Sequence, residues 1–175
     1  MEPDQTPPAP AGGAARAVLA VLLGSAALAA ALLADIRADE GRRTRAYRDL
    51  AGIVTICDGD TAEVRPGQSA TDAECDARTA RALAAHAHPV IACVPALREV
   101  GREPQLRAAV RFAYNVGAAA FCRGSVGRRM RAGDWRGGCD AMLRYDKARV
   151  NGRLRRVRGL ALRRARERAV CLHGL

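Results

Sequence analysis

The sequence is poor in aromatic residues and has no closely spaced pair of cysteines. Only 3% of its 175 residues are Phe, Tyr or Trp, so Leu, Val, Ile and Ala must fill most of the core. The six cysteines form no CxxC pair, and His86, His88 and His173 lack the spacing of metal ligands. Because zinc sites need such spacing, we expect no metal site and no cofactor, and we place the histidines at the surface.

Charge of one sign dominates the chain. The formal net charge is +11, the sequence pI is near 10.6, and arginine far outnumbers lysine. Such a surface favours polyanions: nucleic acid, anionic lipid or an acidic cell-wall polymer. No nucleic-acid-binding motif is recognisable. We therefore expect no nucleic-acid partner.

The cysteines point to an oxidising compartment. Their even number and wide spacing favour three disulfides, although six buried reduced thiols would also fit. Six cysteines allow 15 pairings, so the pairing stays open. The cysteines are Cys57, Cys75, Cys93, Cys122, Cys139 and Cys171.

The N-terminal part divides into two segments. Residues 1–16 are rich in Pro, Ala and Gly, which is typical of a disordered leader. Residues 17–34 carry no charge over 18 positions, just enough to cross a bilayer as a helix. Eight alanines, with Gly24 and Ser25 near the middle, make that run only marginally hydrophobic. We interpret residues 17–36 as a weakly hydrophobic signal-anchor segment.

Other interpretations of this segment stay open. It could be a signal peptide cleaved near Ala29–Ala31, a stable anchor, a weak anchor that later leaves the membrane, or a buried core helix. Because the cysteines favour an oxidising side, we expect the domain that follows, residues 37–175, to lie outside the cytoplasm. Its length of about 140 residues suffices for one core.

The first part of this domain predicts a small hairpin lobe. Residues 36–46 read as a short helix and Val54–Cys57 as a strand. Gly59, Pro66 and Gly67 then break the chain into a β-hairpin region.

The remainder predicts a larger helical lobe. A capping box from Thr71 to Glu74 should open a helix that ends at His86, before Pro89. Further helices are expected from Glu103–Pro104 to Gly117, from Asp134 to Tyr145, and over residues 154–170. The last has an apolar stripe of Leu154, Val157, Ala161, Ala165 and Ala169. The fold class is therefore α+β, with a ligand cleft expected between the two lobes.

Three residues near the start of the domain suggest glycoside chemistry. Glu40 lies at the end of the expected helix, Asp49 in a turn, and Thr55 on the expected strand. Carboxylates in different environments can hold different protonation states. Cleavage of a glycosidic bond needs one acid for the leaving oxygen and a second carboxylate on the opposite face of the sugar.

Four blocks in order resemble phage lysozymes of the T4 type, which are endolysins of glycoside hydrolase family 24. The branch most similar is that of the signal-anchor-release endolysins. The blocks are Glu40–Cys57, Phe112–Arg123, Gly133–Asp140 and Gly159–Leu172.

The resemblance implies a lysozyme-like fold and a muramidase. Such an enzyme cuts the β-1,4 bond between N-acetylmuramic acid and N-acetylglucosamine in peptidoglycan, with inversion. By resemblance, Glu40 is the general acid, Asp49 the second carboxylate, and Thr55 helps place the attacking water. The positions near the sugar contacts are Thr61, Tyr114, Gly124 and Asp146.

The resemblance also implies a location. A phage or prophage protein of this kind is exported in its bacterial host, tethered to the inner membrane through residues 17–34, and later periplasmic. Its partner is peptidoglycan, and we expect a monomer.

The chain departs from the family pattern in two places. The family usually continues after the cysteine with Gly-His-Thr, but Asp60 takes the histidine's place here and Asp58 adds a second acid. The family's common Trp-Asn is Tyr145–Asp146. A carboxyl group that donates a proton needs a raised pKa, which partial burial provides. Arginines that pointed toward Glu40 would oppose this rise in its pKa, so we expect Arg42, Arg43 and Arg45 to face solvent.

Two rival functions follow from the same residues. The acids after Cys57 could have abolished catalysis, leaving an inactive wall- or membrane-binding protein of lysozyme fold. Alternatively, residues 154–170 could act as a cationic membrane-disrupting helix, although an apolar face made mostly of alanine is weak for deep insertion.

Overall fold

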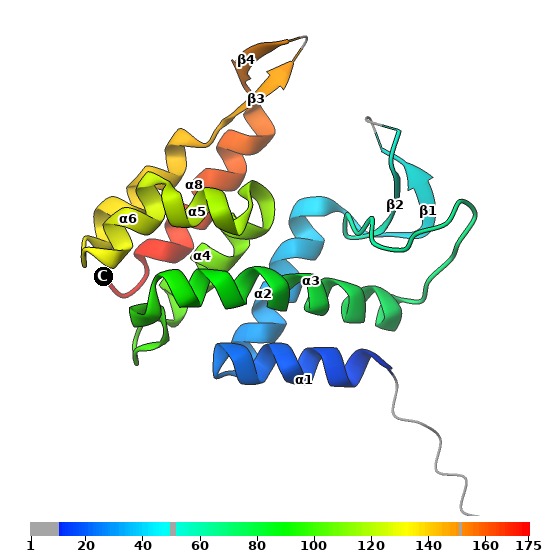
Figure 1. Ribbon diagram of the computed structural model, residues 1–175, viewed down its shortest axis with the longest axis horizontal. Coiled ribbons are helices and arrows are strands. Elements are labelled where there is room, and N and C mark those ends of the chain that lie inside the picture. Colours follow the sequence, from blue (N-terminus) through cyan, green and yellow to red (C-terminus); the bar gives the residue numbers. More distant parts are fainter. Residues whose placement is uncertain (1–10, 50–51, 151) are drawn as a thin grey trace, which may run out of the picture.

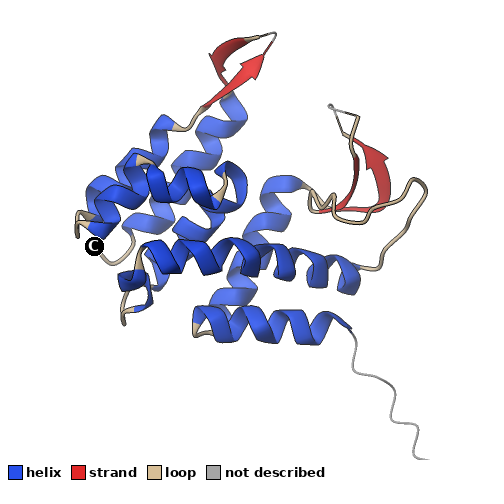
Figure 2. Ribbon diagram, viewed as in Figure 1, coloured by secondary structure: helices blue, strands red, loops and turns tan. Residues whose placement is uncertain are grey.

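The computed structural model describes residues 11–175, apart from 50, 51 and 151. Helices dominate it, with two separate antiparallel hairpins that project from the helical body (Figures 1 and 2). The helices are α1 (Ala11–Leu23), α2 (Ala26–Glu40), α3 (Asp72–Cys93), α4 (Glu103–Val116), α5 (Ala118–Arg123), α6 (Ser125–Arg131), α7 (Trp135–Ala141) and α8 (Arg158–Leu172). The strands are β1 (Arg43–Arg48), β2 (Val54–Cys57), β3 (Lys147–Val150) and β4 (Arg153–Arg156).

The uncharged N-terminal run is divided between two helices. Gly24 has a φ of +75°, which a side chain would strain, and the Ser25 hydroxyl accepts a hydrogen bond from Leu28 N at 3.2 Å to cap α2. The axes of α1 and α2 differ by 113°. Within the described residues no single helix meets the length and composition of a membrane span; only this bent pair does.

The same run is packed into the protein core. Leu19, Leu32 and Ile36 are fully buried, and α1 packs along α3. This arrangement matches the buried-helix alternative for the segment. Residues 11–16, expected to be disordered, belong to α1, whereas residues 1–10 lie outside the described part.

The first hairpin differs from the expected helix over residues 36–46. Gly41, with a φ of +73°, ends α2 at Glu40. The residues after it form β1, which pairs with β2 through Tyr47 opposite Thr55. Pairing with β2, which local pattern could not reveal, outweighs the helical reading of 43–46. The strand at Val54–Cys57 is confirmed.

Helix α3 begins at the predicted capping box and runs past the predicted end. The Thr71 hydroxyl accepts from Glu74 N at 3.2 Å, and the Glu74 carboxylate accepts from Thr71 N at 2.6 Å. The expectation that the helix stops before Pro89 is wrong, because α3 continues to Cys93. Burial of Ala87 and Val90 on either side of the proline offsets its missing hydrogen bond.

The C-terminal elements contain two further corrections. Asp134 caps a helix as predicted, but α7 ends at Ala141 and a 3₁₀ turn follows over Met142–Arg144. The last helix begins at Arg158, because the residues before it form the β3–β4 hairpin. The predicted alanine stripe is wrong: Ala165 and Ala169 are exposed. The buried residues of α8 are Arg163, Arg164, Glu167 and Cys171.

The six cysteines form three disulfides, which confirms their interpretation. Cys57–Cys75 ties β2 to α3. Cys93–Cys122 ties the end of α3 to α5, and Cys139–Cys171 ties α7 to α8. The helix α4, which starts at Glu103–Pro104 and ends before Gly117 as predicted, lies at the centre of the largest hydrophobic cluster.

Packing of the N-terminal run predicts a clear stability effect. Leu32→Ala removes a fully buried side chain from α2, so we expect the free energy of unfolding to fall by about 2–5 kcal/mol. Val21→Ala, at an exposed position of α1, should change it by less than about 0.5 kcal/mol. Urea denaturation of both variants measures the difference, and equal small effects would show that α2 is not part of the core in solution.

Candidate active site

Glu40 is the last residue of α2, and an arginine from the far end of the chain holds it. Arg163 Nη1 of α8 donates to Glu40 Oε1 at 2.5 Å, across 123 residues of sequence. The Glu40 side chain keeps 27% of its surface exposed. Its carboxyl group is thus accessible from outside while it is fixed from the protein side.

The last turn of α2 is clamped by a second carboxylate. Asp39 is almost fully buried, and its two oxygens accept hydrogen bonds from Arg111 Nε and Nη2 at 2.7 Å each. Arg163 Nε lies 3.4 Å from Asp39 Oδ2. Bidentate pairs of this kind fix geometry as well as charge. Asp39 and Arg111 therefore set the position from which Glu40 projects.

Arg163 belongs to a buried ionic cluster on α8. Its Nε donates to Glu167 Oε1 at 3.2 Å, and Arg164 Nη2 donates to the same oxygen at 3.0 Å. Burial raises the pKa of Glu167 and lowers the pKa of Arg164, because water is excluded from both. The Arg164 guanidinium also lies 4.8 Å from the centre of the Phe112 ring.

Sequence reasoning missed this cluster. Arg163, Arg164 and Glu167 were visible as a block of the family resemblance, but the block carried no role. Spacing along α8 could suggest the pairs within the helix. It could not reveal the contact with Glu40, which depends on how α2 and α8 pack.

Asp49 and Thr55 lie in the first hairpin. Asp49 Oδ1 accepts from Ile53 N at 2.8 Å, which ties the residue after β1 to the residue before β2. Thr55 is 3% exposed, and its hydroxyl donates to Ile53 O at 3.1 Å. Both sequence-predicted side chains are thus bonded to the backbone of Ile53.

Tyr114 of α4 connects the helical lobe to the loop after β2. Its hydroxyl donates to Asp58 O at 3.2 Å. Burial, and then the negative charges of Glu40, Asp58 and Asp60, raise the pKa of Tyr114 above its ordinary value of 10. The same loop approaches the acid, because a Cβ placed on Gly59 would lie 4.0 Å from Glu40 Oε2. The structure therefore brings Tyr114 and Gly59 to Glu40.

The other residues expected near the sugar occupy different positions. Thr61 is exposed in the hairpin lobe. Gly124 packs so closely against the Tyr145 hydroxyl and the Ala120 carbonyl oxygen that an added Cβ would clash with both, so packing favours a glycine there. Asp146 is mostly buried and accepts from Arg156 Nε at 2.5 Å.

The two acids after Cys57 are both neutralised. The Asp58 carboxylate accepts from Arg42 Nε at 3.0 Å, Arg42 Nη2 at 2.6 Å and the Thr79 hydroxyl at 2.7 Å. Asp60 accepts from Arg78 Nη1 at 2.8 Å. Our expectation that Arg42 faces solvent is wrong, because only 6% of its side chain is exposed. Arg43 and Arg45 are exposed as predicted.

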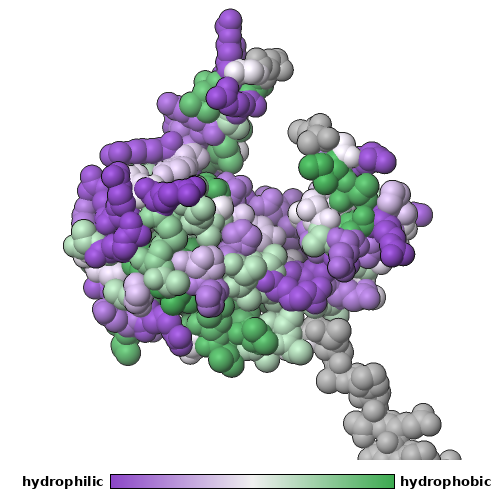
Figure 3. All heavy atoms as spheres, viewed as in Figure 1, coloured by the Kyte–Doolittle hydropathy of each residue, from purple (hydrophilic) through white to green (hydrophobic). Residues whose placement is uncertain are grey.

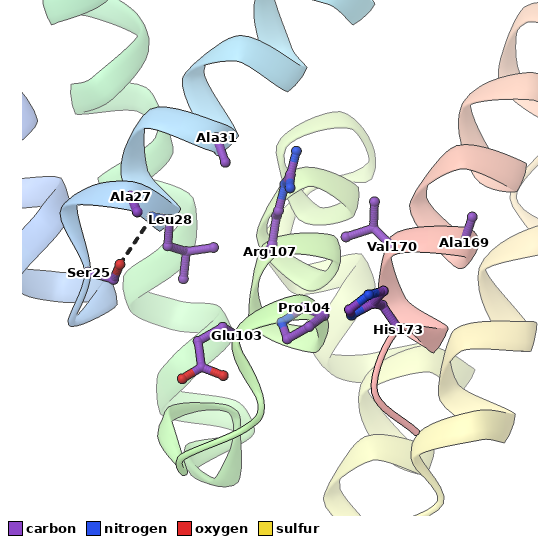
Figure 4. Close-up of a pocket in the computed structure, with 10 residues that line it drawn as sticks. All are labelled: Ser25, Ala27, Leu28, Ala31, Glu103, Pro104, Arg107, Ala169, Val170 and His173. Carbon is purple, nitrogen blue, oxygen red and sulfur yellow. Dashed lines mark hydrogen bonds between the residues drawn. The ribbon is translucent and has the colours of Figure 1, made fainter.

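The surface is hollowed between the two hairpins (Figure 3), and the C-terminal end of α2 points toward this hollow (Figure 1). A separate apolar pocket of about 600 Å³ lies between the start of α2, the start of α4 and the end of α8 (Figure 4). Leu28, Pro104 and Val170 line it, far along α2 from Glu40. Among the residues that the structure describes, Glu103 is the one acidic residue that lines this apolar pocket. Within the described residues no cluster of three His, Cys, Asp or Glu could hold a metal.

Comparison with known proteins gives consistent matches. The sequence model of the Phage lysozyme family matches residues 37–167. A SAR-endolysin of Pseudomonas phage phiKMV is 37% identical over 155 residues, covering 86% of this chain and 91% of the relative. A SAR-endolysin of Bacteriophage PS119 is 35% identical over 136 residues, covering 77% of each.

Solved structures agree with those matches. An endolysin from Escherichia coli O157:H7 phage FAHEc1 superposes with a TM-score of 0.74 at 26% identity, covering 82% of this chain and 92% of that one. The muramidase domain of SpmX from Asticaccaulis excentricus has a TM-score of 0.73 at 29% identity, covering 81% and 95%.

The buried Arg42–Asp58 pair predicts an asymmetric mutational effect. Arg42→Met leaves the Asp58 charge buried without its arginine, so we expect a loss of about 3–5 kcal/mol in the free energy of unfolding. Adding Asp58→Asn should restore part of that loss. Arg45→Met, at an exposed position of β1, is the control with an expected change below about 0.5 kcal/mol. Urea denaturation measures all three, and a loss no larger than the control's would contradict the pair's importance.

Proposed function

The chain belongs to the phage lysozyme family, and from that premise we propose that it cuts the β-1,4 bond between N-acetylmuramic acid and N-acetylglucosamine. It is a peptidoglycan-lysing endolysin with lysozyme-type glycosidase activity. The observation that carries the finer proposal is that Arg163 fixes Glu40, the last residue of α2, and that this end of α2 points toward the hollow between the two hairpins (Figure 1).

We assign Glu40 the role of general acid. Glycoside cleavage requires an acid that delivers a proton to the leaving oxygen. Glu40 is partly exposed, and Arg163 fixes its carboxyl group from one side. Proton donation then requires the carboxyl to part from Arg163, so we expect that contact to break when a sugar occupies the hollow.

Asp49 and Thr55 are assigned to the attacking water. In an inverting enzyme, the second carboxylate activates a water on the opposite face of the sugar, and the two carboxyl groups stand apart to leave room for it. Asp49 belongs to the hairpin lobe and Glu40 to α2, which supports separate positions for the two groups. The Thr55 hydroxyl, held beside Ile53 O, would orient that water.

Sugar contacts are proposed at Thr61, Tyr114, Gly124 and Asp146. Tyr114 is the best supported of the four, because the Glu40 charge acts on its hydroxyl and its ring lies half-buried at the junction of the lobes. Gly124 and Asp146 also have packing and ion-pair roles. Loss of activity after their substitution would therefore need a folding control.

The N-terminal segment is proposed to regulate the enzyme. Residues 17–34, inserted in the inner membrane, would tether the exported protein on the periplasmic side until the segment leaves the bilayer. The support is continuity: α2 begins inside this run and ends at Glu40. Since one helix holds both, Glu40 cannot take its place beside Arg163 while the segment is in the membrane. We retain the expectation of a monomer.

An inactive wall-binding protein remains the rival proposal. The argument for it was the acid at the family's histidine position, but Asp58 and Asp60 each have an arginine partner, so the hairpin lobe is not burdened with uncompensated charge. The membrane-disrupting alternative for residues 154–170 loses its basis, since that segment is a hairpin followed by a helix with buried arginines.

Substitution of the three assigned residues tests the catalytic proposal. Glu40→Gln removes the proton donor, and we expect clearance of a peptidoglycan suspension to slow by about 10²–10⁴-fold. Asp49→Asn and Thr55→Val should also slow it. Glu63→Gln, an exposed carboxyl in the hairpin lobe, is the matched control and should clear normally. A folded wild-type protein that binds peptidoglycan without clearing it would favour the rival proposal.

Added hydrophobicity in the signal-anchor segment tests the regulatory proposal. Ala17, Ala30 and Ala34 are exposed in α1 and α2, so replacing all three with leucine leaves the packed form intact but favours the bilayer. We expect this variant to stay in the membrane fraction and to fail to lyse its host. The control carries leucine at exposed Ala85, Ala132 and Ala165 and should lyse as wild type does. Normal lysis by the variant with leucine at Ala17, Ala30 and Ala34 would refute the proposal that insertion of this segment in the membrane regulates the enzyme.

A further inference from the structure

The β3–β4 hairpin is an exposed, strongly cationic projection. Residues 147–158 contain six cations and no acid. The strand register places two cations, Lys147 and Arg156, directly opposite each other. Like charges directly across a strand pair destabilise it. The hairpin thus concentrates positive charge at a cost to its own stability.

Compensating negative charge is present only at the base of the hairpin among the described residues. Asp146 pairs with Arg156, and Asp146 O accepts from Val157 N at 2.8 Å to close the base. Beyond that point Arg149, Arg153 and Arg155 extend into solvent. An anionic ligand is the natural complement of such a surface.

The hairpin is connected through the first turns of α8 to the arginine that holds the proposed catalytic acid. Its second strand leads directly into α8, and Arg163, which touches Glu40, follows five residues after the first residue of that helix. At 1.5 Å per residue, that distance is about 7.5 Å along the helix axis. Figure 3 shows the hairpin as one wall of the hollow toward which α2 points.

We propose that the β3–β4 hairpin binds the carboxylates of the peptide stems on the glycan strand that occupies the hollow. This inference rests on the proposed function, because it needs peptidoglycan in that hollow. The stems carry the anionic groups nearest to a scissile bond between the two amino sugars. Guanidinium groups recognise carboxylates through paired hydrogen bonds, which suits a hairpin armed almost wholly with arginine.

A membrane surface fits the hairpin less well. Leu154 and Val150 are both exposed. Leu154 shares one face of the hairpin with Arg149, and Val150 shares the other face with Arg153. Neither face is a continuous apolar surface that could enter a bilayer. The hairpin and α1, which contains the start of the signal-anchor segment, also lie at opposite ends of the molecule (Figure 1).

The test combines a charge variant with two substrates. Arg149→Gln, Arg153→Gln and Arg155→Gln together remove three exposed charges and spare the Arg156–Asp146 pair. On intact sacculi we expect the substrate concentration for half-maximal rate to rise about threefold to tenfold, with the maximal rate unchanged, as for the loss of a few exposed ion pairs. An amidase that removes the stems leaves one lactyl carboxylate on each muramic acid and takes away the stem carboxylates. On such strands wild type and variant should behave alike, because the proposal concerns the stem carboxylates alone.

A charge-matched control separates the hairpin from net charge. Arg81→Gln, Arg98→Gln and Arg131→Gln remove three exposed arginines from α3, the 3₁₀ turn at Pro95–Arg98, and α6, and should leave both substrates unaffected. An equal loss in this control, or a loss on stem-free strands, would overturn the proposal. So would a hairpin variant whose only defect is weaker binding to phosphatidylglycerol vesicles, which would point to lipid.

Cosedimentation keeps this proposal separate from the proposed function. Intact and stem-free peptidoglycan are each mixed with wild type and the two triple variants, and bound protein is measured without reference to cleavage. Weaker binding of the hairpin variant to intact material alone supports the hairpin's role. If wild type binds but cleaves neither substrate, the catalytic proposal fails; if all variants bind equally, the hairpin proposal fails.

Discussion

The contact between Arg163 and Glu40 is the constraint on which the arrangement of this endolysin depends. It joins the end of α2 to the middle of α8, and so connects the N-terminal run of the chain to its C-terminal helix. Around it, Asp39, Arg111 and Glu167 complete a buried network. Without that network, α2 could still pack through its leucines, but the direction of the Glu40 side chain would be unspecified.

This network is better explained by positioning than by stability. Removing ions from water is costly, and their mutual attraction only offsets that cost when the geometry is good. The raised pKa of Glu167 and the lowered pKa of Arg164 both record the cost of burial. A core of apolar side chains at these positions could be as stable, but it would not present Arg163 to an acid. We infer that the cluster holds the Glu40 carboxyl group in one place.

Local signals in the sequence predicted local structure well, and long-range packing accounts for the failures. The capping box at Thr71, the proline start of α4 and the even count of cysteines were confirmed because each depends on neighbouring residues or on chemistry. The expected start of the last helix at residue 154 was wrong, because Arg153–Arg156 pair as a strand with Lys147–Val150 and α8 begins only at Arg158. The predicted alanine stripe failed for a related reason: charged residues of α8 are buried only because Asp39, Glu40 and Asn115 meet them from other helices.

The two acids that follow Cys57, Asp58 and Asp60, illustrate the same dependence on distant partners. Read alone, Asp58 and Asp60 suggest repulsion near the cleft. In the fold, Asp58 is bonded to Arg42 and to the Thr79 hydroxyl of α3. Asp60 is bonded to Arg78 of α3. Arg42 also contacts Asp72 and Asp76 at the start of α3. The negative charges after Cys57 are therefore part of an ion-pair network that ties the first hairpin to the helical lobe. The carbonyl oxygen of Asp58 accepts a hydrogen bond from the Tyr114 hydroxyl.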